Sequence, residues 1–396
     1  MNKKLLAVAL ATAFAAPAMA EGVQIYGSMS YGAAMRSGSD GIGLPGNATQ
    51  QNSTGSTALN GGQTGNHKSF TGEMALGNYI GFKGSEDLGN GTSLGFVAEF
   101  GFGSETATNA VTRLANLSLS GNWGTLIGGR VAGARYSFTN MYDAFGGKGV
   151  ANGGSIFGGH GVSQADYADN AIVYVTPELA PGLKLLGAYT FSLSGPDGSG
   201  GRAGTDTCAY NNTSRTCGNV QLYAIAALYN QGPLSVTLDY ENAKLPGLLA
   251  AGNGLNYESI YVAGASYDFG VIKPMAYYES IRDQLHTGKS DYQGYMLGAT
   301  APVSEQMLVK ASYVHHSKET LGSCNKYGLG VDYNVSKRTR FFADVTKIEN
   351  SGQAECRVSY SSRSPSQNTG QALTNLNTGS DLYGTSAIGV GVQHTF

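Results

Sequence analysis

The sequence predicts an all-β fold in which sixteen antiparallel strands close into a barrel that spans a membrane. Three observations support this prediction: a leader typical of exported proteins, apolar and polar residues that alternate with a period of two, and short turns that alternate with long polar loops. The composition agrees, because charged residues make up 13% of the chain and 59 of its 396 residues are glycine. An ordinary globular domain has about 25% charged residues and about 7% glycine.

The composition also excludes three other classes of protein. The 24 Tyr and 14 Phe provide too much aromatic material for a disordered chain. Only 10 Pro are present and glycine has no three-residue period, which excludes collagen. With 25 basic and 27 acidic side chains the net charge is −2, so the chain has no electrostatic basis for binding nucleic acid.

Residues 1–20 have the three parts of a secretory signal peptide. Two lysines precede the apolar stretch Leu5–Phe14, and Ala18–Ala20 forms a small-residue cleavage site. We therefore expect a mature chain of residues 21–396 that carries 23 basic and 27 acidic side chains. After residue 20 no stretch approaches the ~20 apolar residues that a membrane-spanning helix needs. The exported chain is thus either soluble or a closed barrel, since a closed barrel is the other structure that pairs every backbone group in lipid.

Hydrophobic residues alternate with polar or small ones along most of the mature chain. Near the C-terminus Ile388, Val390 and Val392 share one parity and lead to the aromatic Phe396. A period of two indicates strands, and alternating segments of ~10 residues that end in aromatics are typical of transmembrane barrels. The predicted strands lie near residues 22–36, 70–84, 91–103, 111–121, 124–131, 169–177, 182–194, 219–230, 233–244, 256–269, 271–284, 292–302, 306–319, 325–335, 339–350 and 384–396.

The connections between these strands are of two alternating kinds. Short turns alternate with long connections rich in Gly, Ser, Asn and Thr, among them 37–69, 132–168, 195–218 and 351–383. A barrel with one tight rim and one elaborated rim has this asymmetry. A soluble sandwich or propeller is the alternative, but strands in such folds average five or six residues, and no repeat of 20–50 residues is present.

Four cysteines lie in the mature chain. None belongs to a CxxC pair or has a His at zinc-finger spacing, so we expect no metal site and no cofactor. Cys208 and Cys217 lie in the connection 195–218, which favours a local disulfide. Cys324 and Cys356 are separated by a strand, a short turn and a strand, so both emerge on the long-loop rim, where a second disulfide can form. Four free thiols are the alternative, and they are a poor choice on an oxidising surface.

Six segments of the chain carry recognisable motifs. In order they are Gln24–Gly27 (QIYG), Asn78–Gly91 (NYIGFKGSEDLGNG), Arg113–Arg130 (RLANLSLSGNWGTLIGGR), Tyr142–Gly146 (YDAFG), Asn170–Gly182 (NAIVYVTPELAPG) and Gly391–Phe396 (GVQHTF). Together they resemble the general porins of Gram-negative outer membranes, a family of sixteen-stranded trimers. The resemblance implies a water-filled channel in outer-membrane lipid, narrowed by the loop 132–168 folding inward. It also implies a homotrimer, and a terminal Phe396 that the outer-membrane assembly machinery recognises as an assembly signal.

In such porins arginines on the wall face acids on the inward loop, and charge rings of this kind set ion selectivity. Carried over residue by residue, the resemblance assigns the pore constriction to Tyr79, Arg113, Arg130, Asp143, Lys148 and Tyr167. Tyr79 and Tyr167 stand where the family usually has arginines, and the loop segment 155–159 (SIFGG) lacks the family's acid. Lys148 and His160 are additional loop residues that carry charge or partial charge. The implied constriction is less charged and more aromatic than the family norm, which weakens ion discrimination or favours solutes with stackable faces.

The alternation along the strands predicts which of these side chains face the lumen. Tyr79 lies opposite Ile80 and Phe82 in parity, which predicts an inward ring. Arg113 shares its parity with the apolar Leu117, so its pore role comes from the resemblance and not from the pattern. Three of the assigned residues have an alternative role, in which they anchor the base of the loop by hydrogen bonds: Arg130, Asp143 and Tyr167.

The predicted function is passive diffusion of ions and small hydrophilic solutes through an outer-membrane channel, without a chemical step. We expect a lumen wall of mixed sign, set by Asp239, Glu241, Lys310, Asp332, Arg340 and Asp344. A solute-selective porin, an adhesin that uses the loops 37–69 and 351–383, and an outer-membrane enzyme are the alternatives. No Gly-x-Ser-x-Gly elbow adjoins any of the six His, and the adjacent His315 and His316 point to opposite faces of a strand, so we expect no enzyme.

Overall fold

The computed structural model describes residues 22–38, 50–51, 57–58, 65–71, 78–102, 111–157, 167–192, 209–211, 214–216, 221–245, 256–282, 291–318, 322–352, 356, 358 and 384–396. Three expectations lie outside the described residues. They are the signal peptide at 1–20, the loop residue His160, and the pairing of Cys208 with Cys217.

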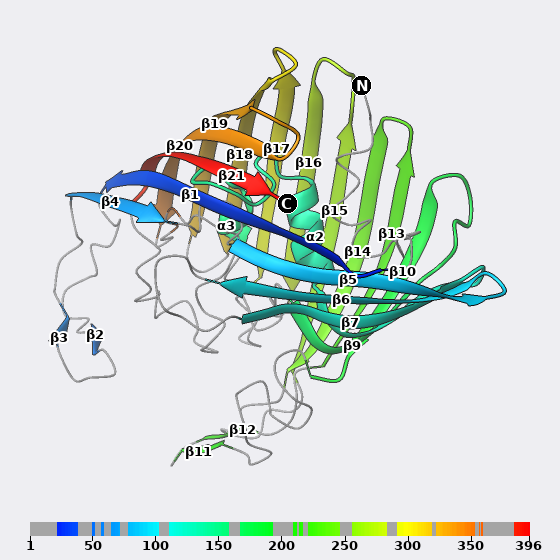
Figure 1. Ribbon diagram of the computed structural model, residues 1–396. Coiled ribbons are helices and arrows are strands. Elements are labelled where there is room, and N and C mark those ends of the chain that lie inside the picture. Colours follow the sequence, from blue (N-terminus) through cyan, green and yellow to red (C-terminus); the bar gives the residue numbers. More distant parts are fainter. Residues whose placement is uncertain are drawn as a thin grey trace.

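Seventeen strands form one antiparallel sheet that closes into a barrel with sixteen strand positions (Figure 1). They are β1 (Gln24–Gly38), β4 (Gly65–Thr71), β5 (Asn78–Gly89), β6 (Thr92–Phe102), β7 (Val111–Gly121), β8 (Gly124–Ala132), β9 (Tyr167–Val175), β10 (Leu183–Thr190), β13 (Gln221–Gln231), β14 (Leu234–Leu245), β15 (Asn256–Tyr267), β16 (Lys273–Arg282), β17 (Tyr292–Pro302), β18 (Met307–Lys318), β19 (Gly322–Asn334), β20 (Thr339–Gly352) and β21 (Ser386–Thr395). Four short strands form two separate ribbons: β2 (Gln50–Gln51) with β3 (Thr57–Ala58), and β11 (Ala209–Asn211) with β12 (Ser214–Thr216).

The first and last strands close the barrel. β1 pairs with β21 in a register that places Ser28 opposite Thr395 and Ser37 opposite Ser386. At the end of this seam the backbone N–H of Gly27 donates to the carbonyl of Phe396 over 3.2 Å, and the N–H of Phe396 donates back to Gly27 over 3.1 Å. Closure pairs both edges of the sheet, as a β-structure in lipid requires.

The second strand position differs from the prediction, which placed one continuous strand at 70–84. The structure has two strands there: β4 pairs with the outer half of β1, and β5 pairs with its beginning. Thr71 lies opposite Gly32 and Tyr79 lies opposite Ser28. The chain therefore advances eight residues from Thr71 to Tyr79 while β1 advances only four. The surplus of four residues is even and preserves the parity of the alternation, which is why the pattern did not reveal the interruption.

The two faces of the wall have opposite character. Large outward side chains are apolar and exposed, as Leu117 (58%) on β7 and Ile225 (61%) on β13 show. The inward positions of β1 are polar and buried, and they include Ser28, Ser30 and Arg36. The period-two prediction is therefore confirmed, and the apolar outer face suits contact with lipid chains.

Aromatic rings gather near both ends of the strands. At the short-turn rim, where turns such as 122–123 join the strands, the rings of Trp123 and Tyr174 stack with centroids 6.4 Å apart. Towards the long-loop rim, at the opposite end, two rows of three tyrosines run across neighbouring strands: Tyr223, Tyr240 and Tyr261, and Tyr295, Tyr313 and Tyr327. Two aromatic girdles around an apolar band mark the water–lipid boundaries of a membrane barrel.

The segment 133–157, which follows β8, lies inside the barrel (Figure 1). It carries two short helices, α2 (Ala134–Met141) and α3 (Gly154–Phe157). The main hydrophobic core lies between this connection and the inner wall. Its loop side includes Phe138, Tyr142, Val150, Ile156 and Phe157, and its wall side includes Ile260, Val262, Tyr277, Met296 and Val314. In the part of the chain that the structure describes, no helix combines the length and the apolar character needed to cross a membrane.

Candidate pore constriction

The inward connection begins at the end of β8, and residues 133–157 of it are described. We refer to residues 133–157 as the inner loop. Gly133 has an extended backbone, and its carbonyl accepts a hydrogen bond from the N–H of Ser137 (3.0 Å), which begins α2. The helix ends at Tyr142, whose N–H donates to the carbonyl of Phe138 (3.2 Å). α2 contacts β14 and β15, and α3 contacts β18, so the inner loop lies along one side of the lumen.

Rings of the inner loop pack directly on glycines of the wall. A Cβ added to Gly264 would lie 2.2 Å from the Tyr142 ring, and a Cβ added to Gly294 would lie 2.5 Å from the Phe157 ring. Any larger residue at these wall positions would push the ring away. The hydroxyl of Tyr142 also lies 2.9 Å from Thr237 Oγ1, which fixes the ring at its far end.

A buried arginine joins α2 to an acidic part of the wall. Nε of Arg135 lies 3.4 Å from Glu279 Oε2, and the backbone N–H of Arg135 donates to Glu241 Oε1 over 3.2 Å. The hydroxyl of Thr139 also lies 2.9 Å from the hydroxyl of Tyr277, which in turn donates to Glu279. Four buried carboxylates lie on this part of the wall: Asp239, Glu241, Glu258 and Glu279. These charged contacts and the packed rings hold α2 against the wall.

Asp143 organises the turn that follows α2. Its carboxylate accepts backbone N–H groups from Phe145 (3.0 Å), Gly147 (2.9 Å) and Gly153 (3.0 Å). Burial raises the pKa of this carboxyl, while the three N–H donors and the nearby Lys326 act to lower it. Asp143 is only 4% exposed. The structure thus gives it the anchoring role, which was the alternative to a charge facing the permeating ions.

Lys326 on β19 holds the second half of the inner loop against the wall. Its ammonium donates to the carbonyl of Asn152 (2.6 Å) and to the hydroxyl of Ser155 (2.8 Å), and its side chain is buried. A buried ammonium needs such partners, because an unpaired charge in the protein interior is costly. Lys326 therefore positions the loop and does not act as a free charge in the lumen.

The opposite wall carries Tyr79, Arg113 and Tyr167 in one cluster. The guanidinium of Arg113 lies 4.8 Å from the centroid of the Tyr79 ring and 5.5 Å from that of Tyr167. Nε of Arg113 donates to the carboxylate of Glu99 on β6, and the hydroxyl of Tyr26 donates to the same carboxylate over 3.0 Å. Both tyrosine rings thus contact the guanidinium of Arg113.

A β-bulge explains why Arg113 points inward. In the β6–β7 ladder Glu99 faces Leu114 and Phe100 faces Thr112, so Arg113 is the extra residue on β7. A bulge shifts the parity of the residues that follow it. Arg113 therefore lies on the inner face although Leu117, four residues later, is exposed on the outer face.

Arg130 lies at a second bulge, between β8 and β9. Nε of Arg130 donates to the carbonyl of Thr112 (3.0 Å), and its Nη1 pairs with the carboxylate of Asp169. The ring of Tyr167 lies 5.2 Å from this guanidinium and 5.9 Å from the ring of Tyr136 on α2. Arg130 and Tyr167 thus connect the root of the inner loop to the wall.

Lys148, on the inner loop, lies among charges of the remaining wall. Lys310 pairs with Asp332 (2.7 Å) and Asp344 (3.6 Å), and Arg340 pairs with Asp332 (2.5 Å). Burial lowers the pKa of Lys148 to about 7, helped by Arg340, Lys310 and Arg113, while Asp332 acts in the other direction. Among the described residues, no carboxylate forms an ion pair with Lys148.

The charges around the lumen nearly balance. Four cations of the wall each have a carboxylate partner, and Lys148 adds one further cation beside them. The five cations are Arg113, Arg130, Lys148, Lys310 and Arg340, and the four acids are Glu99, Asp169, Asp332 and Asp344. The wall is polar and of mixed sign: this group has one cation in excess, and the four carboxylates beside α2 (Asp239, Glu241, Glu258 and Glu279) add acid elsewhere.

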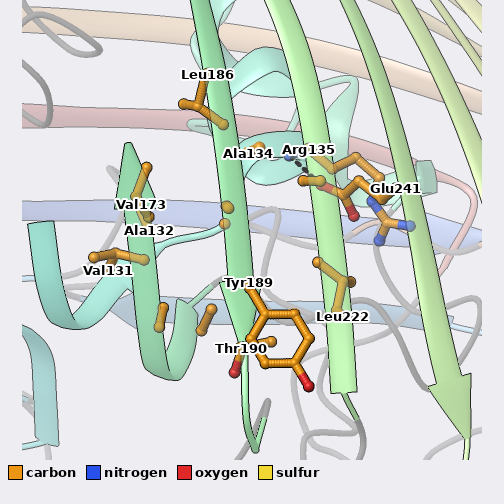
Figure 2. A pocket seen from close by; sticks show the side chains of 15 residues that line it. Val131, Ala132, Ala134, Arg135, Val173, Leu186, Tyr189, Thr190, Leu222 and Glu241 are labelled. Carbon is orange, nitrogen blue, oxygen red and sulfur yellow. Dashed lines mark hydrogen bonds between the residues drawn. The ribbon is translucent and has the colours of Figure 1, made fainter. Parts of the chain in front are cut away.

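A pocket lies behind the root of the inner loop (Figure 2). Its lining is mainly apolar, with Val131, Val173, Leu186 and Leu222 from the wall. Its polar end is Glu241, whose carboxylate already accepts the N–H of Arg135. Neither a paired nucleophile and base nor a cofactor cradle is present in this lining, and its packing supports the loop.

Several residues that build this site were not predicted from the sequence. Glu99, Asp169, Arg135 and Lys326 all position groups around the lumen. Glu99 could have been found, because it lies between Ala98 and Phe100 on a strand whose other parity is apolar. Arg135 and Lys326 could not, because their partners lie about 100 or more residues away in the chain.

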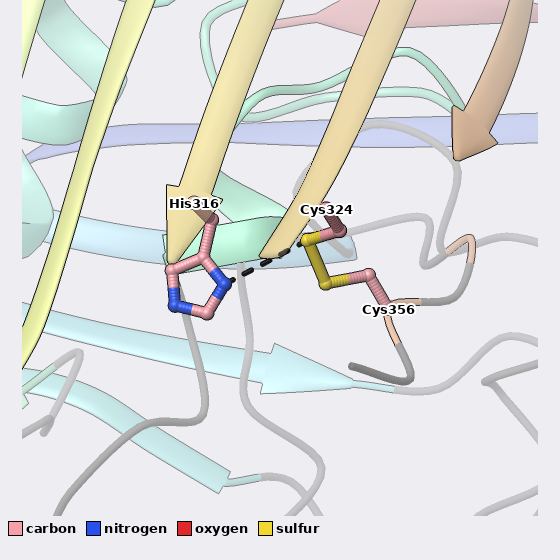
Figure 3. A group of neighbouring side chains, drawn as sticks. All are labelled: His316, Cys324 and Cys356. Atoms are coloured by element: carbon pink, nitrogen blue, oxygen red, sulfur yellow. Dashed lines mark hydrogen bonds between the residues drawn. A yellow bond between two sulfur atoms is a disulfide. The ribbon is translucent and has the colours of Figure 1, made fainter. Parts of the chain in front are cut away.

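At the long-loop rim Cys324 and Cys356 are joined by a disulfide (Figure 3). The bridge ties the beginning of β19 to the chain that follows β20. The other predicted pair, Cys208 with Cys217, lies outside the described residues.

A closed barrel with an apolar outer belt, a polar inner wall and a loop folded into its lumen defines a class of protein: a transmembrane channel for hydrophilic solutes. Comparison with known families agrees. The family model of the Gram-negative porins matches residues 7–353, and the chain belongs to this family. It is therefore an outer-membrane channel through which solutes diffuse, and not an enzyme.

Two curated relatives have the same character. The chain is 28% identical over 382 residues to an outer membrane porin protein of Bordetella pertussis, covering 87% of this chain and 93% of the relative. It is also 28% identical over 283 residues to outer membrane porin protein 32 of Delftia acidovorans, covering 68% of this chain and 74% of the relative.

Solved structures share the fold at lower identity. The anion-selective porin from Comamonas acidovorans matches with a TM-score of 0.67 and 23% identity, over 95% of this chain and 99% of that one. The trimer form of OmpT from Vibrio cholerae matches with a TM-score of 0.61 and 13% identity, over 96% and 100% of the two chains.

Proposed function

We propose that this porin is a general diffusion channel with a weak preference for anions. The observation that carries the proposal is the inner loop: it is fixed inside the lumen, and its Lys148 is the cation in excess over the ion pairs of the wall. Strong selectivity needs unpaired charges at the narrowest point. Here Arg113, Arg130, Lys310 and Arg340 each share their field with a carboxylate, so the preference is small.

The constriction residues have distinct roles in this proposal. Lys148 is the residue that contacts permeating ions. Tyr79 and Arg113 form the part of the wall that faces it. Arg130 and Tyr167 border the lumen and fix the loop root. Asp143 shapes the loop from within.

The proposal includes export and assembly. Residues 1–20 act as a cleaved signal peptide, and three copies of the mature chain associate in the outer membrane. Phe396 serves as the signal for the assembly machinery. Its backbone forms two hydrogen bonds with Gly27 at the end of the closing seam, which supports a role of this residue in barrel closure. The trimer form of OmpT supports the oligomeric state by analogy of fold.

The test is single-channel recording of the purified, folded protein in a planar lipid bilayer under a salt gradient. We expect large steady current steps in groups of three and a reversal potential displaced slightly towards the anion limit. A reversal potential on the cation side would overturn the anion preference. Single, ungrouped steps would overturn the trimer, and folded protein without conductance would overturn the diffusion channel itself.

A further inference from the structure

Three potential metal ligands meet on the inner wall at the long-loop rim (Figure 3). His316 on β18 and Cys324 on β19 are cross-strand partners, 4% and 0% exposed. Cys356 follows β20 and is bonded to Cys324 in the oxidised protein. The ligand atoms of the three side chains all lie within 4.8 Å of one another.

The geometry of the His–Cys pair fits a tetrahedral metal centre. Cys324 Sγ lies 3.6 Å from His316 Nδ1. Zn²⁺ takes sulfur at ~2.3 Å and imidazole nitrogen at ~2.0–2.1 Å, so two such ligands at a tetrahedral angle are about 3.6 Å apart. The ring of Tyr292 lies 4.1 Å from the imidazole, centroid to centroid, and restricts its orientation.

Cys356 has contacts with the wall other than its covalent bond. The side chain of Asn350 accepts the N–H of Cys356 (3.0 Å) and donates to its carbonyl (3.1 Å). Asn350 itself is the ladder partner of Cys324. The backbone of Cys356 is therefore held beside β19 by two hydrogen bonds that do not depend on the disulfide.

We propose that the reduced form of this porin binds one Zn²⁺ per chain through Cys324 Sγ, Cys356 Sγ and His316 Nδ1. A thiol or phosphine reductant supplies two electrons, and with two protons the S–S bond becomes two thiols. Zn²⁺ then binds the two thiolates and releases two protons, with water as the fourth ligand. The disulfide prevents metal binding, because the metal ligand is a thiolate and the two sulfurs of a disulfide are not thiolates.

In the reduced protein the metal ion would take the place of the disulfide as the link at the rim. In either state, β19 and the chain after β20 remain joined at the rim, once by a sulfur–sulfur bond and once through the ion. The sequence did not suggest the site, because its ligands lack zinc-motif spacing and are brought together by the β18–β19 register. The site is separate from the constriction residues and does not depend on the anion preference.

The test uses Co²⁺ as a spectroscopic probe on folded, full-length mature protein in detergent. The background variant C208S/C217S removes the other two cysteines. After reduction with a phosphine and its removal without oxygen, we expect one Co²⁺ per chain with a thiolate-to-cobalt absorption band, displaced by equimolar Zn²⁺. The unreduced protein should show no such band. H316Q should weaken binding by more than about 100-fold, beyond the range for loss of an outer-shell partner, whereas H315Q, on the other face of the same strand, should not.

A second measurement tests the site even if the H316Q variant fails to fold. In the background protein itself, Zn²⁺ should slow alkylation of Cys324 and Cys356 by at least tenfold. Absence of the cobalt band, although both thiols can be titrated, would overturn the site. Equal affinity in H316Q and H315Q would also overturn it, because the histidine would then not be a ligand.

Discussion

The guanidinium of Arg113 lies against the ring of Tyr79, 4.8 Å from its centroid, while its Nε pairs with Glu99. A cation over an aromatic face gains about 0.5–2 kcal/mol, with the larger values at desolvated sites. The ring of Tyr79 thus stabilises the guanidinium of Arg113, and the carboxylate of Glu99 neutralises its charge. The cluster gives the lumen a polar edge with little net charge.

Replacing Tyr79 with arginine should strengthen the anion preference. The new charge would lie at the wall beside Arg113, and a unit charge about 5 Å from an ion in water changes the ion's energy by ~0.8 kcal/mol, or about fourfold in occupancy. We expect the reversal potential of Y79R in a salt gradient to move towards the anion limit. Y79F keeps the ring without adding charge and should behave as wild type. An unchanged reversal potential in Y79R would place Tyr79 outside the constriction.

Replacing Glu99, the acidic partner of Arg113, tests how this ion pair affects charge balance and stability. Its side chains are 10% and 8% exposed, and removal of one partner of a buried pair costs about 3–5 kcal/mol. We expect E99Q to be less stable to denaturant by about 3 kcal/mol and more anion-selective, because Arg113 keeps its charge. The double variant E99Q/R113M removes both charges and should return the selectivity to the wild-type value. If E99Q matched wild type in both measurements, the pair would contribute neither charge balance nor stability.

Most of the barrel could be predicted because its physics is local. An outward side chain on a strand contacts lipid, and its neighbours two residues away do the same, so a period of two appears directly in the sequence. The period-two pattern does not predict the structure where the chain leaves the regular hydrogen-bonded ladder. The interruption between β4 and β5 preserves parity, and the bulge at Arg113 inverts it, so the same pattern misses one and misassigns the other.

The site was predictable only in part, for a related reason. The resemblance to porins assigned Arg113, Arg130 and Lys148 to the constriction, and the structure places the two arginines in ion pairs of the wall and Lys148 on the inner loop. It did not identify their partners, because an ion pair between strands depends on register and on the path of the inner loop. Asp143 shows the same limit, since its three backbone donors come from a turn that no sequence pattern specifies.

The charge of Lys148 should make ion selectivity depend on pH near neutrality. Its pKa is lowered to about 7, so the ammonium is present below that pH and lost above it. We expect the anion preference to be greater at pH 6 than at pH 8, by about the fourfold effect of one charge near a passing ion. Reversal potentials at both pH values provide the measurement. K148Q should show the pH 8 behaviour at both, and a pH response that survives in K148Q would assign it to another group.

The packing of Tyr142 on Gly264 should determine how firmly the inner loop is held. In G264A the new methyl group would lie 2.2 Å from the ring, so Tyr142 must move and lose its contact with Thr237. We expect noisier open-channel current and a changed conductance, with the barrel still folded, because the wall strands keep their hydrogen bonds. G187A is the matched control, since a Cβ at Gly187 on the outer face meets nothing within 4 Å. Equal current traces from G264A and G187A would show that the loop is held by its polar contacts alone, chiefly those of Arg135 and Lys326.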